Sequence, residues 1–194
     1  MRITALITGI VLMAATSANA VFVGFDTVPN NTQATAQPLV SNTADWNSAS
    51  CRLSADVGMG SLAAPAGGVG DVDYFSLVLP AGCIVTAITT PLSPFSSAPD
   101  TLLGGLDAAL APYGTNDDAG TDSNGAGTRR GSAIRFLTTA AGTHYIRVTG
   151  FNDTGFAGQH SQAGDYLLTI SVTPEPATLG LLLGGLVFFA RRRK

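Results

Sequence analysis

The chain has 194 residues, a formal net charge of −3 and two cysteines. Between residues 21 and 173, five arginines stand against twelve aspartates without any lysine or glutamate, so this body has a formal charge of −7. Clustered lysine and arginine bind nucleic-acid phosphates, so an acidic body excludes a nucleic-acid-binding function. The length allows one domain of about 100–150 residues with short appendages.

The first segment, MRITALITGIVLMAATSANA, has the parts of a secretory signal peptide. Arg2 precedes an apolar run over residues 3–15, and Ala18, Asn19 and Ala20 form a small-x-small cleavage site. A transmembrane or buried helix is the alternative, but the run is short for a crossing of about 20 residues. We predict a signal peptide over residues 1–20 that exports the protein through the inner membrane.

Short runs of alternating apolar and polar residues predict that residues 21–173 form one all-β sandwich. The clearest strands are DYFSLVLPAG, GTHYIRVTG and GDYLLTISV, and shorter candidates cover residues 83–89, 105–111 and 132–137. Two glycine-rich segments are expected to lack strands. Residues 54–70 should form an irregular connection and residues 112–131 a mobile loop.

The two cysteines, Cys51 and Cys83, lie in the exported part. In an oxidising compartment such a pair most simply forms one disulfide, which would close a loop of about 33 residues and stabilise by about 3–4 kcal/mol. Two buried free thiols are the alternative. Two sulfurs without a nearby histidine fit a zinc site poorly.

Five segments in order resemble the bacterial pre-peptidase C-terminal domain: NNTQATAQPL, GDVDYFSLVLPAG, LDAALAPYGTNDD, AGTHYIRVTG and GDYLLTISV. The resemblance covers nearly all of residues 21–173. It implies a compact, jelly-roll-like antiparallel β-sandwich of the kind appended to secreted proteases, some relatives of which bind collagen or carbohydrate.

The sequence predicts no catalytic residue and a non-enzymatic protein. Only His144 and His160 could serve as histidine bases, and no Gly-x-Ser-x-Gly elbow is present. His144 falls on an apolar strand face and is expected to be a hydrogen-bonded structural residue, whereas His160 is expected to be solvated in a loop. Aspartates are abundant enough for a glycosidase pair, but nothing distinguishes any one pair.

Calcium is the better chemical candidate, because it accepts six to eight oxygen ligands in flexible geometry. In calcium-binding relatives of the pre-peptidase family, matching positions supply ligands, which here are Asp26, Asn30, Asn31, Asp71 and Asp73. A second acidic group in the glycine-rich loop is Asn116, Asp117, Asp118 and Asp122. The alternative is that these side chains cap turns or are simply hydrated.

Four aromatic residues would form a sugar-stacking platform if exposed, and core or loop anchors if not. They are Trp46, Tyr113, Phe151 and Phe156.

The C-terminal segment, residues 174–194, combines a short apolar stretch with a basic end. As a helix, residues 177–190 would measure about 21 Å, against a hydrocarbon core of about 30 Å. The stretch is therefore marginal as a permanent anchor. The basic end would stay on the cytoplasmic side by the positive-inside rule.

This segment is also similar to the PEP-CTERM sorting signal of Gram-negative bacteria. The matching residues are Pro174, Glu175, Pro176, Arg191, Arg192, Arg193 and Lys194. The resemblance implies transient membrane anchoring, processing by an exosortase, and delivery to a surface or matrix rich in exopolysaccharide, as in biofilms. An unprocessed, permanently anchored structural protein is one alternative, and a secreted carbohydrate-binding or peptidase-accessory protein is the other.

Overall fold

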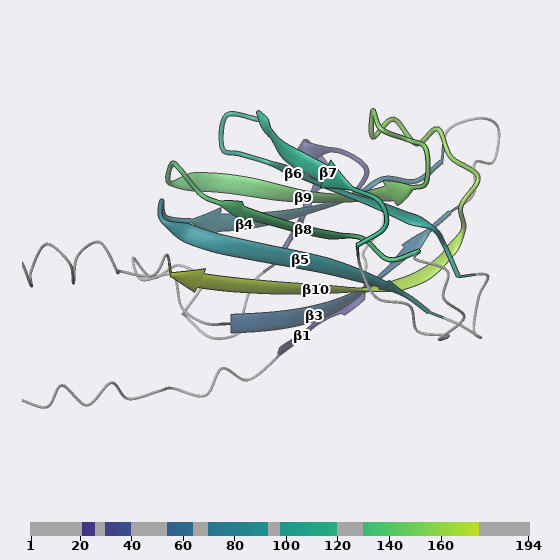
Figure 1. Ribbon diagram of the computed structural model, residues 1–194, viewed down its shortest axis with the longest axis horizontal. Coiled ribbons are helices and arrows are strands. Elements are labelled where there is room, and N and C mark those ends of the chain that lie inside the picture. Colours follow the sequence, from purple (N-terminus) through teal and green to yellow (C-terminus); the bar gives the residue numbers. More distant parts are fainter. Residues whose placement is uncertain are drawn as a thin grey trace, which may run out of the picture.

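Two packed five-stranded sheets form the body in the computed structural model (Figure 1), which describes residues 21–25, 30–39, 54–63, 70–92, 98–119 and 130–174. The first sheet has the order β1-β3-β10-β5-β8. Its strands are β1 (Val21–Phe25), β3 (Ser54–Leu62), β10 (Gly164–Pro174), β5 (Cys83–Pro91) and β8 (Ala133–Leu137).

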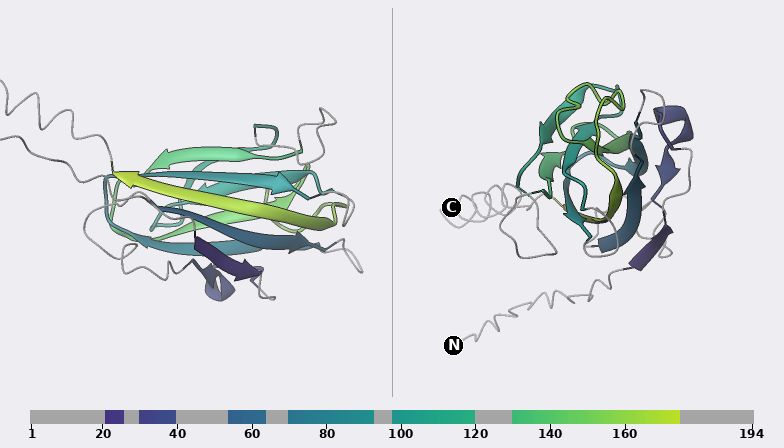
Figure 2. Two further views of the ribbon diagram at one scale, coloured as in Figure 1. Left: turned by 90° about the horizontal axis from the view of Figure 1, so that it is seen from below. Right: turned by 90° about the vertical axis from the view of Figure 1, so that its right-hand side faces the viewer.

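The second sheet has the order β2-β4-β9-β6-β7, and a short 3₁₀ helix, η1 (Gln33–Thr35), precedes its first strand. Its strands are β2 (Gln37–Pro38), β4 (Asp73–Leu79), β9 (Gly142–Gly150), β6 (Thr101–Leu106) and β7 (Pro112–Asn116). Figure 2 shows the two sheets wrapped around a common interior. The predicted all-β antiparallel sandwich is confirmed, with parallel pairing only at β1–β3 and β2–β4 among the described pairs.

The alternating strands place one face of each sheet in the core, as their sequences predict. In β4, Phe75 and Leu77 are buried while Val78 is exposed, and in β9 Ile146 and Val148 are fully buried. A second apolar cluster lies on the outer face of the second sheet, where Phe156 packs beneath the guanidinium of Arg147 at 3.8 Å from the ring centroid. The 151–163 segment therefore covers part of that face.

Three of the strand predictions are wrong. Residues 54–62 form β3, and residues 112–116 form β7 rather than part of a loop. Residues 107–111 are a turn, because the Asp107 carboxylate accepts the N–H groups of Ala109 and Ala111, each at 2.8 Å. Neighbouring strands, rather than local propensity, hold β3 and β7 in place.

The glycine content of β3 has a packing reason. Gly60 lies directly opposite Tyr166 of β10, and any Cβ at Gly60 would overlap the buried tyrosine ring. Glycine therefore makes room for the largest fully buried side chain of the core.

We expect Gly60→Ala to lower the free energy of unfolding by about 1–3 kcal/mol, because the ring of Tyr166 must move. Gly155→Ala is the matched control, because a Cβ there meets nothing within 4 Å, and it should change stability by less than about 0.5 kcal/mol. Urea unfolding measures both. Equal stabilities of the two variants would contradict this packing.

Candidate functional site

The edge strands β7 and β8 come from different sheets and line a cleft of about 270 Å³, here named the seam cleft. β7 pairs through its other edge with β6, and β8 pairs with β5, so the cleft lies where neither ladder continues. Four consecutive residues of each strand line it. They are Tyr113, Gly114, Thr115, Asn116, Ala133, Ile134, Arg135 and Phe136.

An aromatic pair spans the seam cleft from one strand to the other. The ring of Tyr113 stacks on Phe136 with centroids 4.0 Å apart and an interplanar angle of 12°. The Tyr113 hydroxyl lies 3.0 Å from Nδ1 of His144, and Nε2 of His144 lies 3.2 Å from the carbonyl oxygen of Ala140. Because a carbonyl can only accept, Nε2 carries the proton and the Tyr113 hydroxyl donates to Nδ1.

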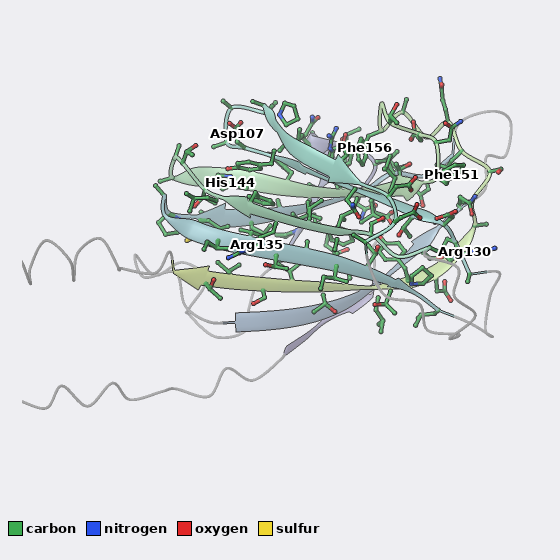
Figure 3. All side chains as sticks on the ribbon, viewed as in Figure 1. Asp107, Arg130, Arg135, His144, Phe151 and Phe156 are labelled. Atoms are coloured by element: carbon green, nitrogen blue, oxygen red, sulfur yellow. The ribbon has the colours of Figure 1, made fainter. Side chains whose placement is uncertain are left out.

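His144 is fully buried, and this burial lowers its pKa; the bond to Ala140 and the charge of Asp107 partly oppose the shift. Burial also raises the pKa of Tyr113, to which Asp107 adds. Burial thus favours the neutral form of both groups. The prediction of a hydrogen-bonded histidine on the buried face is confirmed; Figure 3 labels His144.

Polar groups complete the seam cleft. The side-chain oxygen of Asn116 crosses the seam and accepts the N–H of Ala133 at 3.0 Å, as well as the N–H of Ala119 at 3.0 Å. Thr115 and Arg135 are exposed to solvent. The cleft therefore presents aromatic surface, a hydroxyl and one guanidinium on a rigid frame.

The second predicted calcium group is only partly formed. Asn116 uses its oxygen for the two main-chain bonds above, and Asp122 lies outside the described residues. Asp117 Oδ1 is buried without a hydrogen-bond partner in the described part of the chain, and burial raises the pKa of Asp117, with Asp118 adding to the shift. These groups alone do not make a calcium site.

In the first predicted calcium group, Asp73 points into the protein. It is fully buried at the start of β4, and its carboxylate accepts a hydrogen bond from the hydroxyl of Tyr166. The pair connects the two sheets across the core. Asp73 therefore acts as a structural acceptor in this fold.

Asp71 and the two asparagines lie close together, as the sequence predicted. Burial raises the pKa of Asp71, while the N–H groups of Ala63 and Val72, the charge of His160 and the side chain of Asn31 oppose the shift. Asn30 is fully buried, and its main-chain oxygen accepts the N–H of Tyr74 at 3.0 Å.

The structure therefore brings Asn30, Asn31, Asp71 and Asp73 to one region, but the contacts above bind the two carboxylates to protein groups. Asp26 lies outside the described residues. In the described ranges no three His, Cys, Asp or Glu side chains are grouped to hold a metal. Calcium binding at this group stays a prediction.

The prediction for His160 is wrong, because this side chain is 7% exposed. Its Nε2 donates to the carbonyl oxygen of Asp71 at 2.7 Å, and its Nδ1 accepts the N–H of Gln162 at 3.1 Å. His160 belongs to the 151–163 segment, which Asp153 holds over the second sheet. The Asp153 carboxylate accepts hydrogen bonds from the hydroxyl of Thr149 at 2.7 Å and from the N–H of Gly158 at 2.8 Å.

The predicted platform of four aromatic residues is not formed as one surface. Tyr113 lines the seam cleft, Phe156 is buried and Phe151 is 49% exposed near the opposite end of the sandwich. Trp46 lies outside the described residues.

Cys83 is fully buried at the start of β5. Cys51 lies outside the described residues, so the Cys51–Cys83 pairing stays a prediction. Of the sorting residues, Pro174 ends β10, and those from Glu175 onward lie outside the described part, as does the predicted signal peptide. Among the described residues no helix has the length and apolar character that a bilayer crossing requires.

Sequence reasoning gave Arg135 no role and placed Tyr113 in a loop. Residues 112–116 and 133–137 flank the glycine-rich tract on its two sides. Because the ends of a surface loop lie at neighbouring elements, this position could have indicated that the two segments lie side by side. Period-two patterning could not find β7, because Pro112 and Gly114 are poor strand formers.

We expect acidification from about pH 7.5 to about pH 5.5 to destabilise the protein in part through His144, because its lowered native pKa lets the unfolded chain bind the proton first. His144→Gln should lose less unfolding free energy over the same interval. Urea unfolding of both proteins at the two pH values measures this. If the unfolding free energies of the wild type and His144→Gln depend on pH in the same way, His144 does not contribute to the acid destabilisation.

We expect Tyr166→Phe to cost about 1–3 kcal/mol, because it removes the donor to the buried Asp73 carboxylate but keeps the ring. The loss should be equal in millimolar calcium and in chelator. Tyr74→Phe is the control, because the Tyr74 hydroxyl makes no hydrogen bond within the described residues. A calcium-dependent rise in Tm that disappears in Asp71→Ala protein would instead establish calcium binding.

Among solved structures, the crystal structure of Aeromonas hydrophila PliG, a periplasmic lysozyme inhibitor of g-type lysozyme, is similar to this chain. The identity is 16%, the match covers 71% of this chain and 96% of that chain, and the TM-score is 0.40. No curated protein matches the chain. The resemblance of residues 21–173 to the pre-peptidase C-terminal domain stays a prediction.

The family model of the PEP-CTERM protein-sorting motif matches residues 172–194. This match confirms the tail assignment made from the sequence. It begins inside β10, which ends at Pro174. The chain therefore carries a PEP-CTERM protein-sorting motif, which marks an exported protein that is anchored transiently by its C-terminal region and sorted through an exosortase.

Proposed function

We propose that the chain is a non-enzymatic cell-surface or extracellular-matrix protein whose sandwich binds exopolysaccharide in the seam cleft after sorting by an exosortase. The observation that carries this proposal is the sorting motif over residues 172–194. This motif directs the protein to export and sorting, and the sandwich that precedes it in the chain is the part left to function after processing.

The contacts of the histidines support binding rather than catalysis. His144 bonds to Tyr113 and Ala140, and His160 bonds to Asp71 and Gln162. None of these partners is a serine or cysteine that a histidine base could activate. Both rings instead hold the fold in place.

The seam cleft has the chemistry of a sugar site. Sugar rings offer C–H faces to aromatic surface and hydroxyl groups to amides, hydroxyls and guanidinium groups. Tyr113 and Phe136 supply the first kind of contact, and Thr115 and Arg135 supply the second. Because the seam is open along two strand edges, a polymer could pass through it without presenting a chain end.

Arg135 gives the site a preference. No ion pair engages its guanidinium within the described part of the chain. In a body with a formal charge of −7, an unengaged cation in a cleft favours a sugar that carries a carboxylate. The ligand class that fits is therefore a uronate-containing polysaccharide.

The test is retention of the purified protein on immobilised alginate, a uronate polymer, with dextran as the neutral comparison. We expect alginate binding, weakened roughly tenfold or more by Arg135→Ala, because a charge-assisted hydrogen bond contributes about 1.5–3 kcal/mol. Phe151→Ala is the control, because it removes an exposed aromatic away from the cleft.

Two outcomes would contradict the proposal. If the protein is retained on neither alginate nor dextran, polysaccharide binding in the seam cleft is contradicted. Retention that survives Arg135→Ala but is lost in Phe151→Ala protein would place the site outside the seam cleft.

A further inference from the structure

The end of the sandwich at which β10 finishes is here named the tail-proximal end. Pro174 pairs with Cys83, next to the turn at residues 80–82. The pairs Leu79–Gly142 and Leu106–Tyr145 bring the turns at residues 138–141 and 107–111 to the same end. Figure 1 shows the β10 arrowhead at this end together with the β6–β7 connection.

The three described turns of the tail-proximal end, residues 80–82, 107–111 and 138–141, are apolar and carry little charge. Three of the exposed large apolar side chains lie here, with Val78 59%, Leu110 49% and Leu137 38% exposed. Alanines fill most of the other exposed positions of the three turns. The one ionisable side chain in these three turns is Asp107, whose carboxylate accepts hydrogen bonds from two main-chain N–H groups.

The opposite end has the reverse character. Its described loops carry Asp118, which is exposed, and Asp100 and Asp117, which are half-buried, while Asp71 and Asp153 are buried there. Figure 3 places Phe151 and Arg130 at that end and Asp107 at the tail-proximal end. The sandwich is thus polarised along its strands, with acidic groups far from the point where the tail leaves.

Leu110 breaks a local rule at the tail-proximal end. Its φ is +65°, in the left-handed region that glycine and asparagine adopt more readily. A large apolar residue therefore occupies an exposed turn position where its own backbone conformation disfavours it. Such backbone strain indicates that the Leu110 side chain contacts something other than its own protein chain.

We propose that the tail-proximal end lies on the outer leaflet of the membrane while the tail is inserted. The inference rests on the transient anchoring included in the proposed function. Only residues 175 and 176 separate Pro174 from the apolar stretch at 177–190, and the three Cα–Cα steps from residue 174 to residue 177 span at most about 11 Å. The three turns must then be close to the lipid headgroups.

Two further observations fit this orientation. β1 begins at Val21, directly after the predicted signal peptide, and Val21 pairs with Asp56, which pairs with Ile170 in the last part of β10. The two ends of the exported body thus adjoin the same end. The acidic loops point away, which avoids repulsion from anionic lipids.

The test uses the chain from Val21 to Lys194 in phosphatidylethanolamine–phosphatidylglycerol nanodiscs, with and without a lipid that carries a gadolinium chelate on its headgroup. We expect the paramagnetic lipid to remove amide NMR intensity at residues 80–82, 107–111 and 138–141. Intensity at residues 151–158 should persist.

Leu110→Asn supplies the matched variant, because asparagine suits the backbone conformation and removes the apolar side chain. It should restore intensity at residues 107–111. Phe151→Asn, with the same 49% exposure at the opposite end, should change nothing. Equal effects of the two substitutions would overturn the proposal.

The amides of the tail test the transient anchoring independently of the three turns. If amides of residues 177–190 lose no intensity, the anchoring fails and this orientation fails with it. If the tail amides are affected but the three turns keep as much intensity as residues 151–158, anchoring stands and the membrane contact of the tail-proximal end is overturned.

Discussion

The pairing of β10 on both sides is the constraint on which the rest of the molecule depends. Gly164 through Val172 pair with β3, and Tyr166 through Pro174 pair with β5, so β10 is the centre of its sheet. Its buried Tyr166 fills the space above Gly60 and donates to Asp73 of the other sheet. The sorting motif begins at residue 172, inside this strand. Fold and sorting signal therefore share residues 172–174, and processing compatible with the sandwich must leave the paired core of β10 in place.

This continuity gives each part of the sandwich a position relative to the membrane. The strand that ends at Pro174 directs the three alanine-rich turns towards the tail and the acidic loops away from it. The seam cleft lies between β7 and β8, and all of its lining residues belong to these two strands. A body held in this way can present the cleft to a polymer both before and after release.

Strong period-two patterning made β4, β9 and β10 predictable, with the correct residues facing the core. β3 and β7 were missed because Gly60, Pro112 and Gly114 weaken strand propensity, and only tertiary pairing and the Tyr166 ring explain them. His144 was assigned correctly because the period-two pattern of β9 places it on the same face as the buried Ile146 and Val148. His160 was not, because its burial depends on the distant contact with Asp71, which local composition cannot report. The same limit hid the pairing of Asp73 with Tyr166.

The most direct test of the account is the mass of the mature protein isolated from a bacterium that exports it. Cleavage after Ala20 and within the Pro174–Pro176 segment predicts a chain that begins at Val21, retains Pro174 and lacks Arg191 to Lys194. A mature chain that still ends at Lys194 would show a permanent anchor instead of a sorting signal. A chain that ends before Val172 would contradict the central role of β10, since the cut would remove part of the core strand.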